Sequence, residues 1–270
     1  MLYAFVRAVL LVPLFRWLFR LRVEGMEHIP QTGPAVIAGN HLSFCDQFLT
    51  VTVTRRKITY LCKKEYFTGR GLKGALTRGF FRGCGQIPVD RSGKEAGQAG
   101  VEAGLRVLHS GELLGIFPEG TRSHDGRMYK GKVGVAMMAL ESGAPVIPCA
   151  VIGTFEAQPA GRRLPRPAPL TIRFGTPLDF SRYAGMEESR EVLRAVTDQI
   201  MYAIMKLSEQ EYIDRYAAEA KAEATAGATT GATTGVTTGV TTGAHAQGTA
   251  AREGDPTKAP RRPVAANQSN

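Results

Sequence analysis

Cysteine is scarce and dispersed in this chain. The 270 residues include four cysteines, Cys45, Cys62, Cys84 and Cys149, and no two of them form a CxxC pair. This pattern argues against a zinc site and against a disulfide framework, and it favours a reducing compartment. We therefore expect neither a metal site nor a disulfide bond.

Long apolar runs are also missing, even from the N-terminal segment, which is the most apolar part of the chain. Its longest uncharged run is Ala8 to Phe15, whereas a membrane-spanning helix needs about 20 apolar residues. The segment has neither the charge placement nor the cleavage site of a signal peptide. We interpret residues 1–23 as one or two short helices, broken near Pro13, that lie in a membrane interface. The alternative is a core helix or hairpin of an ordinary soluble domain.

Acidic side chains are outnumbered, 24 against 34 basic ones, which gives a formal net charge of +10. The excess is concentrated in residues 55–82, where nine basic side chains and one acid are interleaved with Tyr and Phe. Such a surface suits a nucleic acid, and it suits an anionic membrane or a phosphorylated substrate equally well. Charge alone therefore does not separate a binding protein from an enzyme.

Nucleotide-binding and hydrolase motifs are absent or incomplete. The segment from Gly69 to Gly74 matches GxGxxG, but it follows a charged stretch instead of a strand. The segment from Gly126 to Lys132 nearly matches a P-loop, but Val133 stands where a Ser or Thr must bind magnesium. No GxSxG motif is present. We therefore discount nucleotide binding and a serine-hydrolase mechanism.

Apolar runs bounded by glycine, proline or charge recur along the chain. They predict strands at 34–39, 58–62, 85–89, 113–117, 145–152 and 169–174. Helical patterns lie between these runs and at 187–217, so we expect a single α/β domain over 24–217, with a central, mainly buried sheet flanked by helices. Residues 218–270 contain a Gly/Thr repeat that buries little apolar surface, and we expect them to form a disordered tail.

The candidate general base is His41, which follows the apolar run ending at Gly39 and precedes Asp46 by five residues. On a continuous helix the two side chains would diverge by about 140°, so they can meet only in a turn at the end of a strand. There the carboxylate would fix one ring nitrogen while the other takes a proton. The alternative is a polar strand-end histidine beside an Asp helix cap. Ser43 is expected to bond to backbone and not to act as a nucleophile.

A second polar cluster follows the apolar run that ends at Phe117. Glu119, Gly120, Thr121 and Arg122 place a carboxylate, a flexible backbone and a guanidinium at a sheet edge, where α/β domains bind ligands. Arg122 suits a phosphate, and Glu119 could hold that arginine or accept a substrate hydroxyl. The alternative is an ordinary surface Glu–Arg pair.

Taken in order, these segments resemble the glycerolipid acyltransferases that share an HxxxxD motif, over roughly residues 24–180. NHLSFCD resembles their first motif, GQIPVDR the second, FPEGTRS the third and VIPCAVIG the fourth. The likeness is strongest to 1-acylglycerol-3-phosphate acyltransferases. It implies transfer of a fatty acyl chain from acyl-CoA or acyl carrier protein to lysophosphatidate, which gives phosphatidate in phospholipid synthesis. No cofactor is implied beyond the acyl thioester, which is a co-substrate.

The resemblance also implies roles for individual residues. It makes His41 the general base and Asp46 its orienting carboxylate. The remaining implied residues are Glu119, Gly120, Thr121 and Arg122 at the glycerophosphate site, Arg91 and Lys63 on the phosphate, and Pro148 on the acyl-donor side. The implied location is the cytoplasmic face of the cell membrane, peripheral on an anionic surface, with no nucleic-acid partner.

Other hypotheses stay open at this point. The acceptor could be glycerol-3-phosphate or another lysophospholipid, because these need the same base and similar anion contacts. A different phosphoester enzyme could use Arg122 and Arg91, and a non-enzymatic basic protein could bind lipid headgroups or nucleic acid through residues 55–82. A His–Asp pair without a serine nucleophile favours direct acyl transfer, because a thioester is already activated.

Overall fold

The computed structural model describes residues 2–90, 96–159, 162 and 164–233. Residues 1–227 form one compact unit, and residues 228–270 form a second. The predicted N-terminal segment belongs to the first unit together with the predicted catalytic domain.

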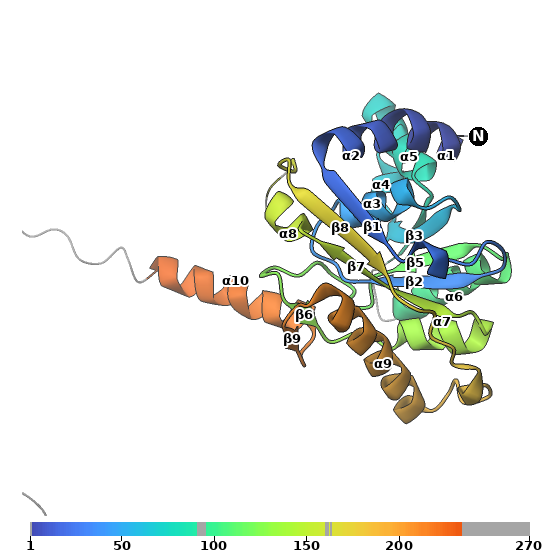
Figure 1. The fold of residues 1–270 in the computed structure, drawn as a ribbon. Coiled ribbons are helices and arrows are strands. Elements are labelled where there is room, and N and C mark those ends of the chain that lie inside the picture. Colours follow the sequence, from blue (N-terminus) through green and yellow to red (C-terminus); the bar gives the residue numbers. More distant parts are fainter. Residues whose placement is uncertain (1, 91–95, 160–161, 163, 234–270) are drawn as a thin grey trace, which may run out of the picture. The chain divides into compact units, whose positions relative to one another are not determined.

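A seven-stranded sheet forms the centre of the first unit, with the strand order β1-β8-β7-β2-β5-β3-β4 (Figure 1). All neighbouring strands are parallel except β7 and β8, which are antiparallel. The predicted α/β class and all six predicted strands are confirmed. The strands are β1 (Arg20–Glu24), β2 (Ala35–Gly39), β3 (Ile58–Lys63), β4 (Gln86–Val89), β5 (Leu113–Ile116), β7 (Val146–Ile152) and β8 (Pro169–Phe174).

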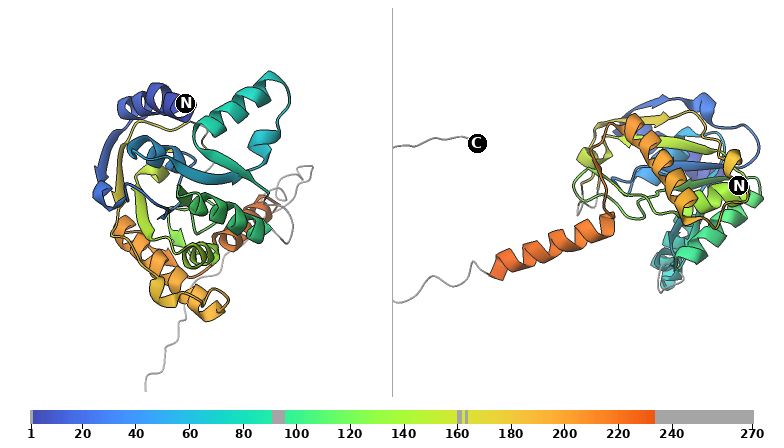
Figure 2. Two further views of the ribbon diagram at one scale, coloured as in Figure 1. Left: turned by 90° about the vertical axis from the view of Figure 1, so that its right-hand side faces the viewer. Right: turned by 90° about the horizontal axis from the view of Figure 1, so that it is seen from below.

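Helices cover both faces of the sheet (Figures 1 and 2). The N-terminal helices, α3, α4 and α5 bury one apolar cluster with one face, and α6, α7 and α9 bury a second cluster with the other. A sheet buried on both sides explains why its central strands are nearly continuous apolar runs. The helices are α1 (Leu2–Phe5), α2 (Val12–Leu18), α3 (Asp46–Val53), α4 (Glu65–Thr68), α5 (Gly71–Gly83), α6 (Ala96–His109), α7 (Gly134–Ser142), α8 (Thr154–Ala157), α9 (Arg190–Ser208) and α10 (Ala217–Thr233).

The N-terminal segment differs from its prediction in two ways. The predicted break near Pro13 is wrong: a π-helical stretch, Val6–Leu11, leads directly into α2, and Pro13 lies in the first turn of that helix. Pro13 has no backbone N–H to donate, and the change from π-helical to α-helical pairing falls at this point of the helix. The helical part ends at Leu18, and Arg20–Glu24 form an edge strand paired with β8. Its alternating charges are typical of a protected sheet edge.

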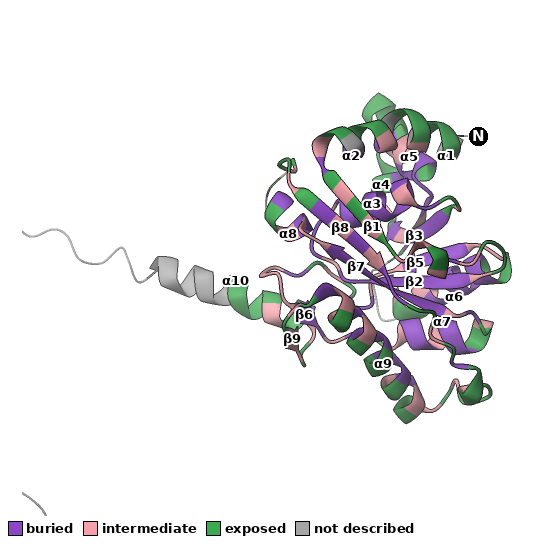
Figure 3. Cartoon of the chain, in the orientation of Figure 1, coloured by how far each residue is buried: buried purple, intermediate pink, exposed green. Residues whose placement is uncertain are grey.

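One side of this helical segment belongs to the core, and the other is apolar and open to solvent. Leu11 and Phe15 are buried in the first apolar cluster, whereas Phe5, Val9 and Trp17 are exposed. Figure 3 shows exposed residues of α1 and α2 in green. Arg7 donates hydrogen bonds to the carbonyl oxygens at the end of α3. Among the described residues no helix is both long and apolar enough to cross a bilayer.

The chain after α9 contributes a strand to a second, smaller sheet. Strand β9 (Tyr212–Ile213) pairs in parallel with β6 (Met128–Tyr129) in a small second sheet. Helix α10 then covers Ala217–Thr233, so the start of the predicted disordered tail is helical. Its first residues, AAEAKAEA, have high helix propensity, which the Gly/Thr pattern after them obscured. The rest of the predicted tail, 234–270, lies outside the described residues.

Candidate active site

His41 lies at the carboxyl edge of the parallel part of the sheet. Strand β2 ends at Gly39, helix α3 begins at Asp46, and the residues between them form a turn. Strand β2 lies between β5 and β7, so the loops that follow the ends of these parallel strands share one edge. Ligands of open α/β sheets bind at such an edge.

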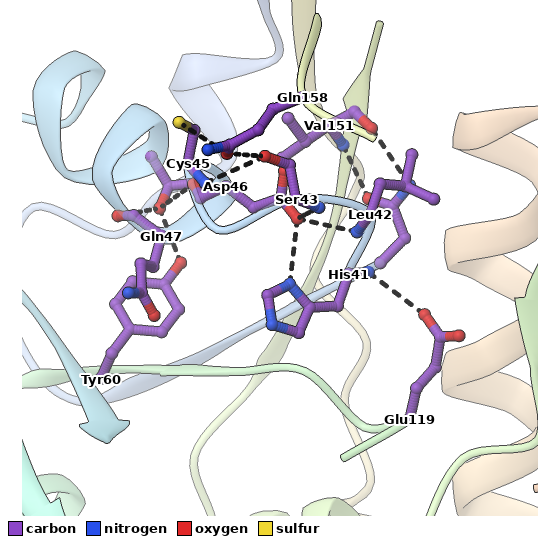
Figure 4. A network of polar contacts seen from close by, with 12 residues as sticks. His41, Leu42, Ser43, Cys45, Asp46, Gln47, Tyr60, Glu119, Val151 and Gln158 are labelled. Carbon is purple, nitrogen blue, oxygen red and sulfur yellow. Dashed lines mark hydrogen bonds and ion pairs between the residues drawn. The ribbon is translucent and has the colours of Figure 1, made fainter. Parts of the chain in front are cut away.

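The turn brings His41 and Asp46 together (Figure 4). His41 Nδ1 lies 3.0 Å from Asp46 Oδ2, and the same oxygen accepts the backbone N–H groups of Leu42 at 2.8 Å and Ser43 at 2.7 Å. The Asp46 side chain is 0% exposed, whereas 16% of the His41 side chain is open. Because the carboxylate can only accept, Nδ1 carries the hydrogen, and Nε2 keeps the lone pair that takes a proton.

Aromatic rings fix the plane of the imidazole. The His41 ring stacks on Phe117, with centroids 4.0 Å apart and planes at 8°, and Phe117 stacks on Tyr60 at 5.4 Å. Gly115 makes room for this column, because a Cβ there would lie 2.3 Å from the Tyr60 ring. The Tyr60 hydroxyl is hydrogen-bonded to Thr50 on α3 at 2.6 Å. The stack and the carboxylate together leave the imidazole little rotational freedom.

Glu119 holds the backbone of His41. It is 1% exposed, its Oε1 accepts the His41 N–H at 3.1 Å, and its Oε2 accepts the Tyr129 N–H at 3.0 Å. Burial raises the pKa of Glu119 to about 8, the two backbone N–H bonds act in the opposite direction, and Asp46 and Asp125 raise the pKa further. Since both oxygens are engaged, Glu119 acts as a support for the loop. The sequence pattern suggested a partner for arginine or for a substrate hydroxyl.

The turn after Glu119 presents two positive charges. Gly120 has φ +75°, and its N–H closes a turn onto the Phe117 carbonyl at 3.0 Å. The Lys132 side chain crosses this glycine, because a Cβ on Gly120 would lie 3.0 Å from Lys132 Cε and 3.3 Å from its Nζ. Arg122 and Lys132 are both exposed. Among the described residues neither forms an ion pair, so both cations are available to an anion.

The residues that follow Arg122 form a compact turn around Asp125. Asp125 accepts hydrogen bonds from Ser123, Arg127 and the Tyr129 hydroxyl. Burial opposes ionisation of Asp125, but these bonds hold its pKa at about 2. Ser123 also donates its backbone N–H to the His41 carbonyl at 2.8 Å. The loop after β5 therefore contacts both the N–H and the carbonyl of His41.

Ser43 is engaged elsewhere. Its hydroxyl donates to Gln158 at 2.7 Å and accepts the Cys45 N–H at 3.1 Å (Figure 4). The thiol of Cys45 also donates to Gln158, and burial raises its pKa to about 11. Within the described part of the chain, neither side chain forms a hydrogen bond with the His41 ring, so this geometry offers no activated nucleophile beside the base.

The other residues implied by the resemblance lie in different settings. Thr121 belongs to the Gly120 turn, and Lys63 ends β3 at the same sheet edge with an exposed side chain. Pro148 is buried within β7, and its ring packs near Gly175 on the face covered by α9. Its role on the acyl-donor side stays a prediction. Arg91 lies outside the described residues, and its role also stays a prediction.

Three residues of the site were not singled out for it by the sequence. Asn40 bonds to both backbone groups of Val151 on β7, at 3.1 and 2.8 Å, and its amide also donates to Gln210 at 2.6 Å. Asn40 adjoins His41 in the sequence, and that position was the only signal available. Lys132 was visible as the end of a failed P-loop match. Gln210 is 170 residues from Asn40, and nothing in its sequence neighbourhood points to the site.

Comparison with known proteins gives a consistent result. A family model described as Acyltransferase matches residues 20–152. The 1-acyl-sn-glycerol-3-phosphate acyltransferase of Bacillus subtilis (strain 168) is 29% identical over 192 residues, which are 70% of this chain and 89% of that protein. The protein of the same name from Limnanthes douglasii is 31% identical over 166 residues, 60% of this chain and 57% of that protein. The chain therefore spans most of the bacterial relative and somewhat over half of the plant one.

A solved structure supports the same assignment. The 1-acyl-sn-glycerophosphate (LPA) acyltransferase PlsC from Thermotoga maritima superposes with a TM-score of 0.58 at 25% identity, over 76% of this chain and 78% of that chain. The match to the family model includes the His41–Asp46 turn, the Glu119–Arg122 turn and the strands that carry them. The chain is therefore similar to acyltransferases both in sequence, over residues 20–152, and in fold.

Proposed function

We propose that this enzyme transfers a fatty acyl chain from an acyl thioester, acyl-CoA or acyl carrier protein, to the free hydroxyl of 1-acylglycerol-3-phosphate, giving phosphatidate. The observation that carries the proposal is a histidine base that is fixed in position next to two cations that form no ion pair with described residues. His41 is oriented by Asp46 at 3.0 Å, and the loop that holds its backbone presents Arg122 and Lys132. A base next to an anion site suits an alcohol that carries a phosphate.

The chemistry needs one base and no covalent enzyme intermediate. His41 Nε2 accepts the proton of the acceptor hydroxyl as its oxygen attacks the thioester carbonyl carbon. The tetrahedral intermediate then collapses, the C–S bond breaks, and the imidazolium returns the proton to the departing thiolate. Asp46 stabilises the imidazolium between these two steps, and burial of the carboxylate strengthens that interaction.

The acceptor phosphate is the proposed ligand of Arg122 and Lys132. A guanidinium gives a phosphate two parallel hydrogen bonds, and an ammonium adds a point charge. The Lys132 side chain lies over Gly120, and Gly120 is two positions before Arg122 in the sequence. Lys63 at the end of β3 is a further cation at this sheet edge.

We also propose that the exposed apolar side of the N-terminal helices and α5 rests on an anionic membrane surface. Helix α1 packs against α5, which brings the two segments together. Trp17 is 85% exposed and Leu72 is 77% exposed, and Arg70 and Lys73 beside Leu72 are also exposed. Apolar insertion combined with basic side chains is the pattern of peripheral attachment.

The activity is tested with purified full-length protein in detergent or vesicles, supplied with acyl-CoA and lysophosphatidate. Free thiol and phosphatidate should form in equal amounts, and His41→Ala should abolish both. Parallel reactions with glycerol-3-phosphate, with other lysophospholipids and with acyl carrier protein as donor identify the substrates. Faster turnover with glycerol-3-phosphate would replace the proposed acceptor, and thiol release that does not depend on any acceptor would reject the proposal.

The membrane contact is tested by sedimentation with phosphatidylcholine–phosphatidylglycerol vesicles. Wild-type protein should stay bound in 1 M salt, because salt at a Debye length of about 3 Å screens charges but not apolar insertion. The Trp17→Ser/Leu72→Ser double variant should bind only at low salt. Tyr202→Ser, an exposed aromatic change on α9, is the matched control. Equal binding of the double variant and the control in 1 M salt would exclude this face.

A further inference from the structure

The segment that follows α9 reaches back to the active site. Helix α9 ends at Ser208, and Glu209 turns the chain with a left-handed φ of 59°. Residues 209–215, here called the C-terminal strap, then run beside the loop that follows Arg122. The strap lies beyond residues 20–152, the part of the chain that the family model matches.

Gln210 joins the two loops of the site through its side chain. Its Oε1 accepts the Asn40 amide at 2.6 Å, and its Nε2 donates to the Gly126 carbonyl at 2.6 Å. Asn40 immediately precedes His41, and Gly126 belongs to the loop that carries Arg122. One amide therefore contacts the base-bearing loop with one end and the cation-bearing loop with the other.

The backbone of the strap extends this connection. The Met128 N–H donates to the Glu211 carbonyl at 2.9 Å, and the Lys130 N–H donates to the Arg215 carbonyl at 2.9 Å. Between these two rungs the Tyr129 N–H donates to Glu119, whose other oxygen accepts the His41 N–H. The strap thus holds the two neighbours of Tyr129, and Tyr129 is joined through Glu119 to the backbone of the candidate base.

We propose that the C-terminal strap is a positioning element of the active site and that Gln210 is its positioning residue. The proposal rests on the proposed function, in which His41 and Arg122 act on one substrate. Gln210 touches no reacting atom, but it fixes the spacing between the base and the phosphate site. A misplacement of about 1 Å between reacting groups can cost on the order of 10²-fold in rate. Side-chain positions in such sites must hold to within about 0.5 Å.

The test compares two strap variants in the full-length enzyme. Gln210→Ala removes both side-chain bonds. Glu211→Ala is the matched control, because it keeps the backbone bond to Met128 and removes an exposed side chain whose ion pair with Arg127 is long, at 3.8 Å. We expect Gln210→Ala to lower kcat at least about tenfold, leave KM for acyl-CoA within about twofold, and shift the pH–rate profile. Gln210→Glu keeps the acceptor for Asn40 and loses the donor to Gly126, so its kcat should be intermediate.

The outcomes separate this proposal from the proposed function. If wild-type protein transfers no acyl group, the proposed function fails before the strap is tested. If wild-type is active and Gln210→Ala matches Glu211→Ala in kcat and pH profile, the strap proposal is overturned. A loss of kcat that follows only the folded fraction, with an unchanged pH profile, would make the strap merely structural and would also overturn it. Should Gln210→Ala not fold, Gln210→Glu is read by the same criteria.

Discussion

The two loops that meet at His41 differ in how many of their functional side chains already have partners. In the loop after β2, the side chains of Asn40, Ser43 and Asp46 are all hydrogen-bonded, and the His41 ring is bonded on one nitrogen and stacked on one face. In the loop after β5, Glu119 is fully engaged, whereas Arg122 and the adjoining Lys132 are exposed cations. The first loop is built to hold a base still, and the second leaves charges for a substrate to pair with.

This difference has a physical reason. A general base acts only from a defined position and with a defined tautomer, so its environment must be completed by the protein. A phosphate-binding cation gains its partner from the substrate, and a permanent protein carboxylate would compete with that substrate. The two loops should therefore respond to mutation in different kinetic parameters.

Removal of the base should have the largest effect. His41→Ala should lower kcat by about 10²–10⁴-fold, because a positioned base of this kind typically contributes that much. Circular dichroism should show a folded protein, since the partly exposed ring stacks on Phe117 and belongs to neither apolar cluster. Retention of most of the wild-type turnover by the folded variant would remove His41 from the mechanism.

Replacement of Glu119 by glutamine should lower the free energy of unfolding, because Glu119 supports the backbone of His41. Because the pKa of Glu119 is raised in the folded state to about 8, the folded protein holds this proton more tightly than the unfolded chain. The contribution of Glu119 to the free energy of unfolding is therefore full below its ordinary pKa and declines as the pH rises from there through 8. Glu119→Gln should be less stable than wild type at every pH, since its amide directs a donor at a backbone N–H. The difference in free energy of unfolding between the two proteins should narrow from pH 5 to 8. Urea unfolding at several pH values measures this, and a gap that widens with pH contradicts it.

The charge of Lys132 tests whether the loop after β5 binds the acceptor phosphate. Lys132→Met keeps a long apolar stem over Gly120 but removes the charge. We expect KM for lysophosphatidate to rise about tenfold, or ~1.4 kcal/mol, and KM for acyl-CoA to change little. Lys206→Met removes an exposed lysine charge from α9, outside both loops of the site, and serves as the control. An equal rise in both Michaelis constants would contradict an acceptor-phosphate role.

Deletion of residues 234–270 should have the smallest effect. The Gly/Thr repeat and the polar end contain few apolar side chains that could add to a core. The shortened protein retains α10 and the strap, so its melting temperature and kcat should both stay close to those of the full chain. A clear fall in melting temperature would show that this segment contributes to the folded enzyme.

The sequence predicted the sheet well for a specific reason. Strands β2, β5 and β7 are buried on both faces, so each is an uninterrupted apolar run with a clear start and end. Strand β1 was missed because its alternating arginines, Arg20 and Arg22, fit a membrane-interface segment as well as an edge strand. The first residues of α10 were missed because the repeat after them dominates the composition of that region.

The site was predictable where it is local in sequence. His41 and Asp46 are five residues apart, and a single turn decides whether they meet. The inward direction of Glu119 was not predictable, because its partners depend on how the β2 and β5 loops pack against each other. Gln210 was not predictable either, since its contacts with Asn40 and Gly126 come from the return of the chain after α9.

Steady-state kinetics of two conservative variants can show whether the loop after β2 holds a base and the loop after β5 binds the acceptor. With acyl-CoA saturating and lysophosphatidate varied, Asp46→Asn should lower kcat about 100-fold and leave KM for lysophosphatidate within about twofold. Arg122→Lys should raise that KM about tenfold and leave kcat within about threefold, because an ammonium cannot supply the paired hydrogen bonds of a guanidinium. If both variants change the same parameter, or if Asp46→Asn acts on KM and Arg122→Lys on kcat, the division of labour between the two loops is contradicted.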